Sequence, residues 1–459
     1  MAVKIDCFKA YDVRGRIPDQ LNPDIAYRIG SATAEFLDAK SIVLCRDIRH
    51  SSDELSAAVA RGLTEAGCDV LDIGTGGTEM VYFGTSELAA DGGIMVTASH
   101  NPADYNGLKM VRAESRPISG DTGLEDIRQI AERDERRIGD TPGEQRHVNV
   151  TADYIAKLLS FVDTAVLRPL KIVVNAGNGA AGPTLDLLEA QLPFNFIKVH
   201  HEPDGDFPNG VPNPMIVENR QPTIDAIRES GADLGIAWDG DFDRCFFFDE
   251  NGRFIEGYYV VGMLAESILA GNDGEAIIYD PRLVWNTIEV VESLGGRPVQ
   301  SKSGHSFIKE VMRAEDAVYG GEMSAHHYFR EFSYADSGMI PWLLVAELIC
   351  ETGKPLSQLV AERQAMYPAS GEINRTVNDA GATLKRLHER FAPEALSVDE
   401  TDGYSFEFPD WRFNIRMSNT EPVVRLNVES RGDQELMRLK TETVLAELER
   451  AGEEVPAAE

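Results

Sequence analysis

The chain has 459 residues, of which 43% are hydrophobic and 26% are charged, a balance that is typical of globular proteins and excludes a disordered or fibrous chain. The net charge is −32, from 76 acidic and 44 basic residues. Binding to nucleic acid or to an anionic membrane surface requires clustered Lys and Arg and is therefore not expected. The longest apolar stretch, Met339–Ala346, is far short of the roughly 20 residues that span a bilayer.

The sequence shows no pattern of an exported protein. The segment Met1–Asp6 lacks the apolar core of a signal peptide. The five cysteines are scattered and have no CxxC spacing, which favours reduced thiols over a disulfide framework or a zinc site. We therefore expect a soluble, cytoplasmic protein.

Runs of Val, Ile and Leu alternate with amphipathic stretches along most of the chain, a pattern that predicts α/β architecture. A helix is expected at 52–66, where apolar residues recur on one face. The predicted strands fall into three sets, at 41–45, 68–73 and 93–97; at 170–174, 196–199 and 232–237; and at 275–279, 297–300 and 316–319. Because a similar order recurs, we expect three related α/β units.

The segment after about residue 368 has a different pattern, with helices at both ends and alternating strands between them. This order predicts a small α+β unit. Its expected elements are a helix at 380–391, strands at 403–408, 411–416 and 423–428, and a helix at 433–450. We place the domains at 1–147, 148–255, 256–367 and 368–459.

The third strand of each set runs directly into a polar loop. These loops are Thr97–Pro102, Asp239–Arg244 and Gly321–His327. In open α/β sheets, ligands gather beyond the carboxyl ends of the strands. We therefore expect the three units to contribute one loop each to one central cleft.

The sharpest local signal is the carboxylate triplet Asp239, Asp241 and Asp243. Three carboxylates at alternate positions repel one another, and a hard divalent cation such as Mg²⁺ relieves that repulsion. Arg244 follows at once and can hold a phosphate beside the metal. An acidic surface turn is the competing interpretation, but the apolar run after the loop favours the metal site.

Two further loops carry groups suited to phosphate chemistry. Ser99 is a candidate nucleophile, although its loop taken alone fits an ordinary Ser/Asn/Pro turn better, and no GxSxG elbow is present. The segment Arg416–Thr420, with Arg425 nearby, gathers guanidinium, hydroxyl and amide donors that satisfy phosphate oxygens. A β-turn with a surface arginine explains that segment about equally well.

Taken together, these motifs resemble the α-D-phosphohexomutase family, and within it most closely the bacterial phosphomannomutases. The match runs along the whole chain in the order of the family, through Phe8–Gly15, Thr97–Pro102, Asp239–Arg244, Gly321–His326 and Arg416–Pro422. Ala325 stands where glycine is common in the dual-specificity members, and Phe242 stands where the metal loop often has glycine. A phosphoglucomutase or a dual-specificity phosphomannomutase/phosphoglucomutase therefore remains an alternative.

The resemblance implies three related α/β domains, with mixed sheets between helices, and a C-terminal α+β domain like the TATA-box-binding-protein fold, around one central cleft. It implies a phosphoserine at Ser99, and Mg²⁺ on Asp239, Asp241, Asp243 and an oxygen of that phosphoserine. A ping-pong reaction would interconvert mannose 6-phosphate and mannose 1-phosphate through a hexose 1,6-bisphosphate, which also activates the enzyme. The product would supply GDP-mannose synthesis.

The resemblance also assigns the other site residues. Lys109 and His305 are the candidates for general acid and base, and Lys109 could act as a base if neighbouring cations lower its pKa. Arg244 would stabilise the transferred phosphoryl group. The remaining residues are Glu322, Ser324 and His326 for the sugar; Arg416, Ser418, Asn419, Thr420 and Arg425 for the non-reacting phosphate; and Tyr11, Arg14 and Arg282 at the periphery of the cleft.

Two other classes of protein compete with the mutase. A metal-dependent phosphatase would use Ser99 as its nucleophile and admit water to the phosphoserine. A non-catalytic sugar-phosphate-binding protein is disfavoured because the nucleophile and the complete metal triplet are both present. The partner expected in each case is a phosphorylated hexose, and the sequence gives no prediction of the oligomeric state.

Overall fold

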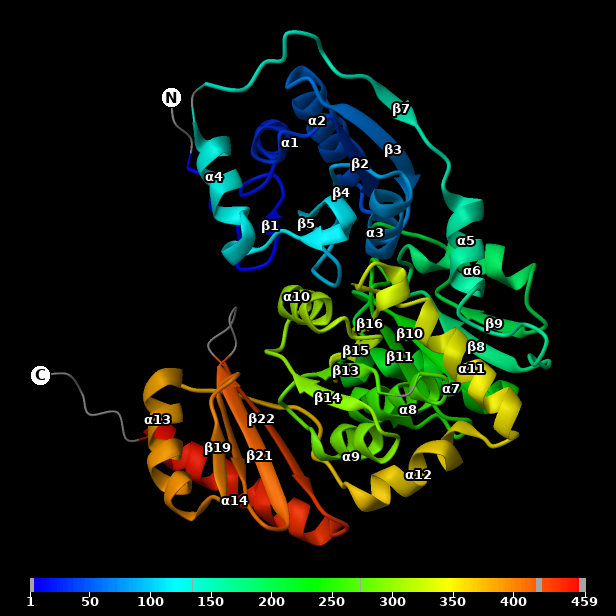
Figure 1. Cartoon of the computed structure of the whole chain (residues 1–459), viewed down its shortest axis with the longest axis vertical. Coiled ribbons are helices and arrows are strands. Elements are labelled where there is room, and N and C mark those ends of the chain that lie inside the picture. Colours follow the sequence, from blue (N-terminus) through cyan, green and yellow to red (C-terminus); the bar gives the residue numbers. More distant parts are fainter. Residues whose placement is uncertain (1–3, 134, 273, 418–422, 454–459) are drawn as a thin grey trace, which may run out of the picture. The chain divides into compact units, whose positions relative to one another are not determined.

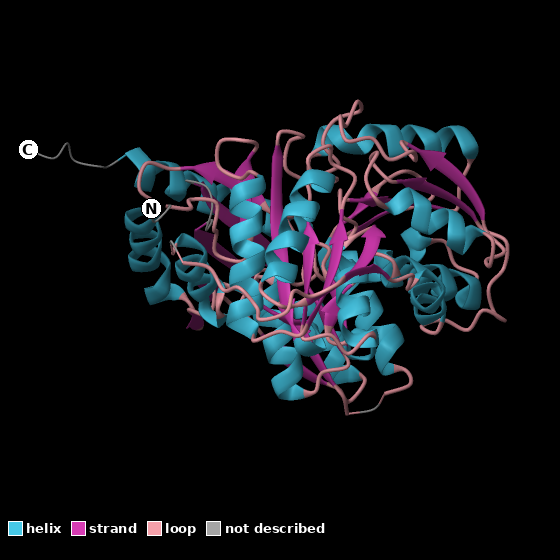
Figure 2. Ribbon diagram, turned by 90° about the horizontal axis from the view of Figure 1, so that it is seen from above, coloured by secondary structure: helices cyan, strands magenta, loops and turns pink. Residues whose placement is uncertain are grey.

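The computed structural model describes residues 4–133, 135–272, 274–417 and 423–453. The chain divides into two units, and each is described by itself. Unit 1 contains Met1–Ile255 and Ser324–Leu356, and unit 2 contains Glu256–Met323 and Ser357–Glu459. Helices and strands alternate along the chain (Figures 1 and 2). Within the described ranges, no helix is long and apolar enough to cross a membrane.

The first sheet of unit 1 has the order β1-β5-β4-β2-β3-β7, with β6 beside β5. Its central strands β4, β2 and β3 are parallel, whereas β5 is antiparallel to β4. The loop that contains Ser99 therefore joins β4 to its neighbour β5. The elements are β1 (Val13–Arg16), α1 (Pro23–Leu37), β2 (Ser41–Arg46), α2 (Ser52–Glu65), β3 (Asp69–Thr75), α3 (Thr78–Glu87), β4 (Gly92–Val96), β5 (Tyr105–Arg112), β6 (Arg116–Pro117), α4 (Leu124–Glu132) and β7 (Gln145–His147).

The second sheet of unit 1 has the order β12-β11-β10-β8-β9. Strands β10, β8 and β9 are parallel, and β11 turns back antiparallel to β10. The elements of this part are α5 (Thr151–Leu159), β8 (Lys171–Asn175), α6 (Ala181–Glu189), β9 (Asn195–Val199), α7 (Gln221–Ser230), β10 (Leu234–Trp238), β11 (Cys245–Phe248) and β12 (Phe254–Ile255). Later in the chain, unit 1 also contains β16 (His327–Phe329) and β17 (Ala335–Asp336), which pair antiparallel with each other, and α11 (Ile340–Thr352). The carboxylate triplet lies in the turn between β10 and β11, and the apolar run Cys245–Phe248 anchors it in the core.

Unit 2 contains a parallel arrangement of β14, β13 and β15 and an antiparallel sheet with the order β18-β22-β21-β20-β19. The elements are α8 (Gly257–Leu269), β13 (Ala276–Tyr279), α9 (Trp285–Ser293), β14 (Arg297–Gln300), α10 (His305–Glu315), β15 (Tyr319–Gly321), α12 (Leu356–Met366), β18 (Ile373–Thr376), α13 (Ala380–Phe391), β19 (Ser397–Asp399), β20 (Tyr404–Glu407), β21 (Trp411–Met417), β22 (Val423–Ser430) and α14 (Gln434–Glu453). The aromatic rings of Phe391, Phe406 and Phe413 pack at the centre of the antiparallel part.

The predicted fold class is confirmed, since α/β layers are followed by an antiparallel sheet with helices. One predicted strand, 316–319, is wrong. Asp316 has φ +48° and ends α10 in the left-handed conformation, with its N–H donating to the carbonyl of Met312. A residue in that conformation cannot extend a strand, so β15 begins only at Tyr319.

Candidate functional site

The loop between β4 and β5 places Ser99 beside the carboxylate triplet. Ser99 is buried, and its Oγ lies 2.9 Å from Oδ2 of Asp239 and 3.1 Å from Nδ1 of His100. Its φ of +48° is in the left-handed region, which is strained for a non-glycine residue. The Ser99 N–H donates to Oγ1 of Thr97 at 2.9 Å. The loop therefore presents the hydroxyl in one fixed direction.

Two arginines hold this loop in place. The guanidinium of Arg49, which is buried, donates to the carbonyls of Ser99, Asn101, Pro102 and Tyr105 at 2.6–3.0 Å. Arg14 donates to Oδ1 of Asn101 at 2.5 Å and to the carbonyl of Ala98. Arg14 was predicted, but Arg49 was not. We infer that Arg49 stabilises the strained backbone at Ser99, because a planar guanidinium can satisfy several carbonyls at once.

The three carboxylates of the triplet are buried, and a ligand oxygen of each lies within 4.8 Å of the others. Among the described residues, Oδ1 of Asp241 and Oδ1 of Asp243 are buried without a hydrogen-bond partner. A buried carboxylate oxygen without a partner is costly, and a divalent cation with oxygen ligands would satisfy both. Glycine is required at position 240, between Asp239 and Asp241, because a Cβ there would lie 2.4 Å from the carbonyl oxygen of Ser99.

Two cations already balance part of this negative charge. Lys109 lies in β5, and its Nζ is 2.7 Å from Oδ2 of Asp241 and 2.6 Å from Oδ2 of Asp243. Arg244 donates its Nε to Oδ2 of Asp239 at 2.8 Å. These contacts use the Oδ2 atoms of Asp241 and Asp243, so the Oδ1 atoms of both remain for a metal. The residues present therefore fit a divalent cation.

The charges shift the pKa values in different directions. Burial raises the pKa of Asp243, and the carboxylate of Asp241 raises it further, to about 7. Burial also disfavours ionised Asp241, but Lys109 outweighs this and holds the pKa of Asp241 below its usual range. For Lys109, burial lowers the pKa, but Asp241 and Asp243 outweigh it and raise the pKa above its usual value. The condition under which Lys109 could act as a base, a pKa lowered by neighbouring cations, is therefore not met, because the two carboxylates outweigh Arg14.

His100 was not assigned to the site from the sequence, and the structure places it in contact with Ser99. Its Nδ1 lies 2.5 Å from Nη2 of Arg244, which is only a donor. Nδ1 must therefore be the unprotonated acceptor, and the proton of the neutral ring is on Nε2. Burial, together with the charges of Arg244 and Arg14, holds the pKa of His100 well below its usual value.

The loop Gly321–His327 is shared between the units, since the first segment of unit 2 ends at Met323 and unit 1 resumes at Ser324. In unit 1, His326 lies 2.8 Å from Oδ2 of Asp336, and both residues have ligand atoms within 4.8 Å of Asp243. His326 is thus close to the metal loop. Ser324 and Tyr11 are partly buried.

In unit 2, Arg282 connects several of the predicted residues. Asp280 accepts from its Nε and Nη2 at 2.8 Å, and Glu322 lies 3.6 Å away. Oε1 of Glu322 also accepts from the N–H of Gly304 at 2.9 Å, directly before His305. The structure therefore places Arg282, Glu322 and the loop of His305 together.

Arg416 and Arg425 lie opposite each other on the neighbouring strands β21 and β22. Both contact Glu372, at 3.3 Å and 3.2 Å respectively. Glu372 was not predicted, and no local pattern marks it. The predicted phosphate ligands Ser418, Asn419 and Thr420 lie outside the described residues.

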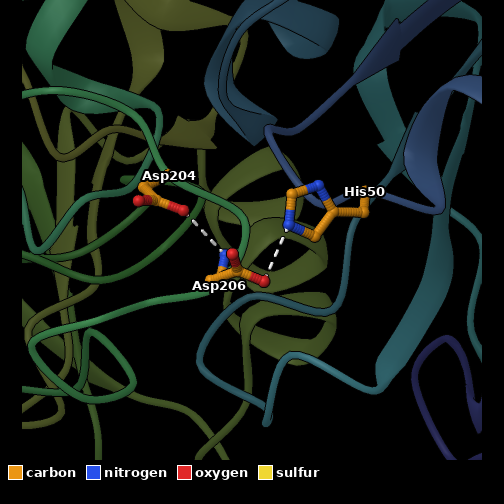
Figure 3. Close-up of side chains that lie close together, drawn as sticks. All are labelled: His50, Asp204 and Asp206. Atoms are coloured by element: carbon orange, nitrogen blue, oxygen red, sulfur yellow. Dashed lines mark hydrogen bonds and ion pairs between the residues drawn. The ribbon is translucent and has the colours of Figure 1, made fainter.

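A separate cluster in unit 1 contains His50, Asp204 and Asp206 (Figure 3). Nε2 of His50 lies 2.9 Å from Oδ1 of Asp206, and the N–H of Asp206 donates to Oδ1 of Asp204 at 2.9 Å. His50 and Asp206 are largely exposed, and an exposed ion pair contributes little stability. Next to this cluster, the ring of Phe207 covers the guanidinium of Arg49 at 5.0 Å. We therefore interpret the cluster as a structural neighbour of Phe207 and Arg49, which support the Ser99 loop.

Comparison with known proteins gives the family. Models of the phosphoglucomutase/phosphomannomutase alpha/beta/alpha domains I, II and III match residues 6–137, 152–252 and 256–367, and the model of the C-terminal domain matches 372–446. The chain belongs to the phosphoglucomutase/phosphomannomutase family. The resemblance that the motifs predict is confirmed. This phosphohexomutase is therefore an enzyme of the isomerase class, which moves a phosphoryl group within its substrate.

Individual relatives of this phosphohexomutase are similar over nearly their whole length. A protein named phosphomannomutase from Escherichia coli is 58% identical over 451 residues, which cover 96% of this chain and 99% of that protein. A Xanthomonas campestris protein named phosphohexose mutases is 57% identical over 441 residues, covering 96% and 98%. The solved structure of a phosphoglucomutase/phosphomannomutase family protein from Burkholderia thailandensis superposes with a TM-score of 0.88 at 32% identity, covering 99% of both chains.

Proposed function

We propose that this chain is a cytoplasmic phosphomannomutase that interconverts mannose 6-phosphate and mannose 1-phosphate. The observation that carries the proposal is the contact of 2.9 Å between Oγ of Ser99 and Oδ2 of Asp239, inside a buried carboxylate triplet. A serine hydroxyl beside a divalent cation site suits phosphoryl transfer, which depends mainly on positioning and charge stabilisation. The names of relatives that are 57–58% identical support mannose as the sugar.

The reaction proposed is a ping-pong exchange through a phosphorylated Ser99. The phosphoserine gives its phosphoryl group to the free hydroxyl of a hexose monophosphate. The bond to Oγ of Ser99 breaks, and Oγ gains a proton. The resulting hexose 1,6-bisphosphate turns around and returns its other phosphoryl group to Ser99. A trace of this bisphosphate would therefore activate the unphosphorylated enzyme.

Each side chain of unit 1 then has a role that its position supports. Asp239, Asp241, Asp243 and an oxygen of the phosphoserine would hold Mg²⁺, which supplies charge neutralisation and orientation of the phosphoryl oxygens. Arg244 stabilises negative charge on the transferred group. Lys109 is charged, so it suits a general acid rather than a base, which leaves His305 as the candidate base.

The residues of unit 2 bind the substrate in this proposal. Glu322, Ser324 and His326 bind the sugar, and Arg416 and Arg425 bind the phosphate that does not react. Ser418, Asn419 and Thr420 would be further ligands of that phosphate, and Tyr11, Arg14 and Arg282 would be peripheral substrate-binding residues. The product would supply GDP-mannose synthesis.

One coupled assay tests this function against its alternatives. The purified enzyme is offered mannose 1-phosphate and glucose 1-phosphate separately, and both the 6-phosphate product and free phosphate are measured. We expect isomerisation with a higher kcat/KM for mannose 1-phosphate and little free phosphate. Equal use of glucose 1-phosphate would indicate a dual-specificity mutase, and release of free phosphate without isomerisation would indicate a phosphatase.

A further inference from the structure

The arginines of unit 2 share one carboxylate, that of Glu372. Nη2 of Arg416 lies 3.3 Å from Oε2 of Glu372, and Nη1 of Arg425 lies 3.2 Å from Oε1. Nη1 of Arg282 approaches Oε2 at 3.5 Å. The side chain of Glu372 is only 7% exposed and that of Arg416 only 11%. Water screens these charges little, so the carboxylate acts strongly on all three guanidinium groups.

Glu372 remains ionised in this environment. Burial opposes ionisation, but Arg282, Arg416 and Arg425 outweigh it and hold the pKa of Glu372 below its usual range. A phosphate bound to Arg416 and Arg425 would therefore lie close to a fixed negative charge. Two anions that share the same donors repel each other, and each weakens the binding of the other.

The guanidinium group of Arg416 is not saturated by this carboxylate. Among the described residues, Nε of Arg416 is buried without a hydrogen-bond partner. The next carboxylate, Asp402, is 3.9 Å from Nη1 of Arg416, too far for a normal hydrogen bond. Arg416 thus shares the carboxylate of Glu372 with Arg425 and keeps a buried donor without a hydrogen-bond partner among the described residues, from which a further anion could accept a hydrogen bond.

We propose that Glu372 is a positioning residue that orients Arg416 and Arg425 and competes with the substrate phosphate for them. The proposal rests on the proposed function, in which these two arginines bind the non-reacting phosphate. The competition keeps the affinity for phosphate moderate. In each cycle the hexose bisphosphate must dissociate from Arg416 and Arg425 and turn around. This step requires a moderate affinity, because binding the ground state more tightly does not raise kcat.

The same carboxylate connects the phosphate site to the sugar loop. Arg282 contacts Glu372 on one side, and Glu322 and Asp280 on the other. When a phosphate binds to Arg416 and Arg425, Glu372 still has Arg282 as a partner. The negative charge of Glu372 is therefore not left uncompensated. Arg282 therefore allows the exchange of partners without an unpaired buried carboxylate, which would be costly.

The test is binding of inorganic phosphate to the full-length enzyme by isothermal titration calorimetry, comparing the wild type with Glu372→Gln. Glutamine keeps the size and one acceptor oxygen but removes the charge. We expect the Kd for phosphate to fall by at least about tenfold, because the repulsion between two negative charges that share the same donors is removed. In turnover with mannose 6-phosphate, KM and kcat should fall together.

Two further variants make the result decisive. Glu372→Ala also removes the charge and should also tighten phosphate binding, so the test survives if glutamine disturbs folding. Glu394→Gln is the matched control, since Glu394 is an exposed partner of Arg390, and its Kd should equal that of the wild type. If Glu372 were only a scaffold for the arginines, both charge-removing variants would weaken phosphate binding, and that outcome would overturn the proposal, as would an unchanged Kd.

Arg416→Ala separates failure of this proposal from failure of the proposed function. If this variant binds phosphate as well as the wild type, Arg416 is not a phosphate ligand and the assignment of the site is wrong. If it binds phosphate more weakly but Glu372→Gln does not bind it more tightly, the site is right and the competition by Glu372 is wrong.

Discussion

The charged clusters of the two units have opposite compositions. In unit 1, three buried carboxylates meet two cations, Lys109 and Arg244, and two carboxylate oxygens remain without partners among the described residues. In unit 2, Arg416 and Arg425 both contact the carboxylate of Glu372, and Nε of Arg416 has no hydrogen-bond partner among the described residues. The first cluster needs a further cation and the second a further anion.

This difference explains how a chain with a net charge of −32 can bind a phosphorylated sugar. The surplus of acidic residues does not determine the local charge, because buried groups are paired and screened separately from the surface. In the account proposed here, a divalent cation completes the cluster of unit 1 and a phosphate completes that of unit 2. Variants of the metal-loop carboxylates and Ser99 in unit 1 should therefore mainly lower kcat, and loss of Arg416 in unit 2 should mainly raise KM.

The largest effect is expected for Ser99→Ala. Loss of the hydroxyl removes the phosphoryl acceptor, so mutase activity should fall by at least about 10³-fold, while the protein still folds and binds mannose 6-phosphate. Steady-state kinetics and calorimetric binding measure the two effects. Ser160→Ala, which removes an exposed hydroxyl at the end of α5, is the control. Normal turnover by Ser99→Ala would show that Ser99 is not the nucleophile.

The metal site should produce the next largest effect. Asp241→Asn removes one carboxylate from the triplet, so kcat should fall by about 10²-fold or more, with little loss of thermal stability, because a buried negative charge is removed as well. Chelation of the wild type should abolish turnover, and Mg²⁺ should restore it. Asp53→Asn, at an exposed position, should keep full activity. Full activity of the chelated wild type would contradict the assignment of the triplet.

Arg416→Ala tests the contrast between the units directly. A charge-assisted hydrogen bond contributes about 1.5–3 kcal/mol, so kcat/KM should fall about tenfold to a hundredfold. Most of the change should appear in KM, and release of free phosphate relative to isomerised product should increase. Arg390→Ala removes an exposed arginine of the same unit and should leave KM unchanged. An unchanged KM for Arg416→Ala would exclude this residue from the phosphate site.

Arg49→Lys should have a smaller effect than Arg416→Ala, and it should change kcat rather than KM. Lysine keeps the charge but loses the planar fork that reaches four carbonyls, so kcat should fall about tenfold, since each lost hydrogen bond costs about 1 kcal/mol and some are replaced. KM should not change, because no substrate contact is removed. Arg28→Lys, at another buried arginine of unit 1, should keep the wild-type kcat. A rise in KM without a fall in kcat would show that Arg49 does not act through the Ser99 loop.

The smallest effect concerns the stability of unit 1 and its dependence on pH. His327 is buried in β16, and burial, with the charge of His326, lowers its pKa to about 3. Because this value lies below the unfolded value near 6.5, neutral His327 contributes stability that is present above pH 6.5 and is lost as the pH falls toward 3. Relative to His327→Asn, the wild type should lose about 1.4 kcal/mol per pH unit below about pH 6.

Denaturant unfolding between pH 7 and pH 4 measures this dependence. His147→Asn, at an exposed position in β7, should keep the pH slope of the wild type. Equal slopes for the wild type and His327→Asn would mean that His327 is not buried in the neutral form.

The sequence predicted the parts of the site that depend on local pattern. The strand before Asp239 is a continuous apolar run, and the triplet follows it directly, so its position at the end of a buried strand was readable. Ser99 was readable for the same reason, but only the set of motifs distinguished it from an ordinary turn. The fold class followed from the alternation of apolar runs and amphipathic helices.

The residues that the sequence did not reveal act across long separations. Arg49 is 50 residues from Ser99, and Glu372 is 44 residues from Arg416 and 53 from Arg425. A single charged residue has no periodicity, and only the folded backbone brings it to its partners. The direction of the pKa shift of Lys109 could not be read from the sequence for the same reason, since it depends on Asp241 and Asp243, which lie 132 and 134 residues away.

The central claim is that Ser99 carries the phosphoryl group during turnover, and mass spectrometry tests it most directly. The wild-type enzyme is incubated with a hexose 1,6-bisphosphate, desalted, and measured as intact protein and as peptides. We predict the added mass of one phosphoryl group, located on Ser99, and its loss when mannose 6-phosphate is then supplied. An adduct on another residue, or one on Ser99 that mannose 6-phosphate does not remove, would contradict the account.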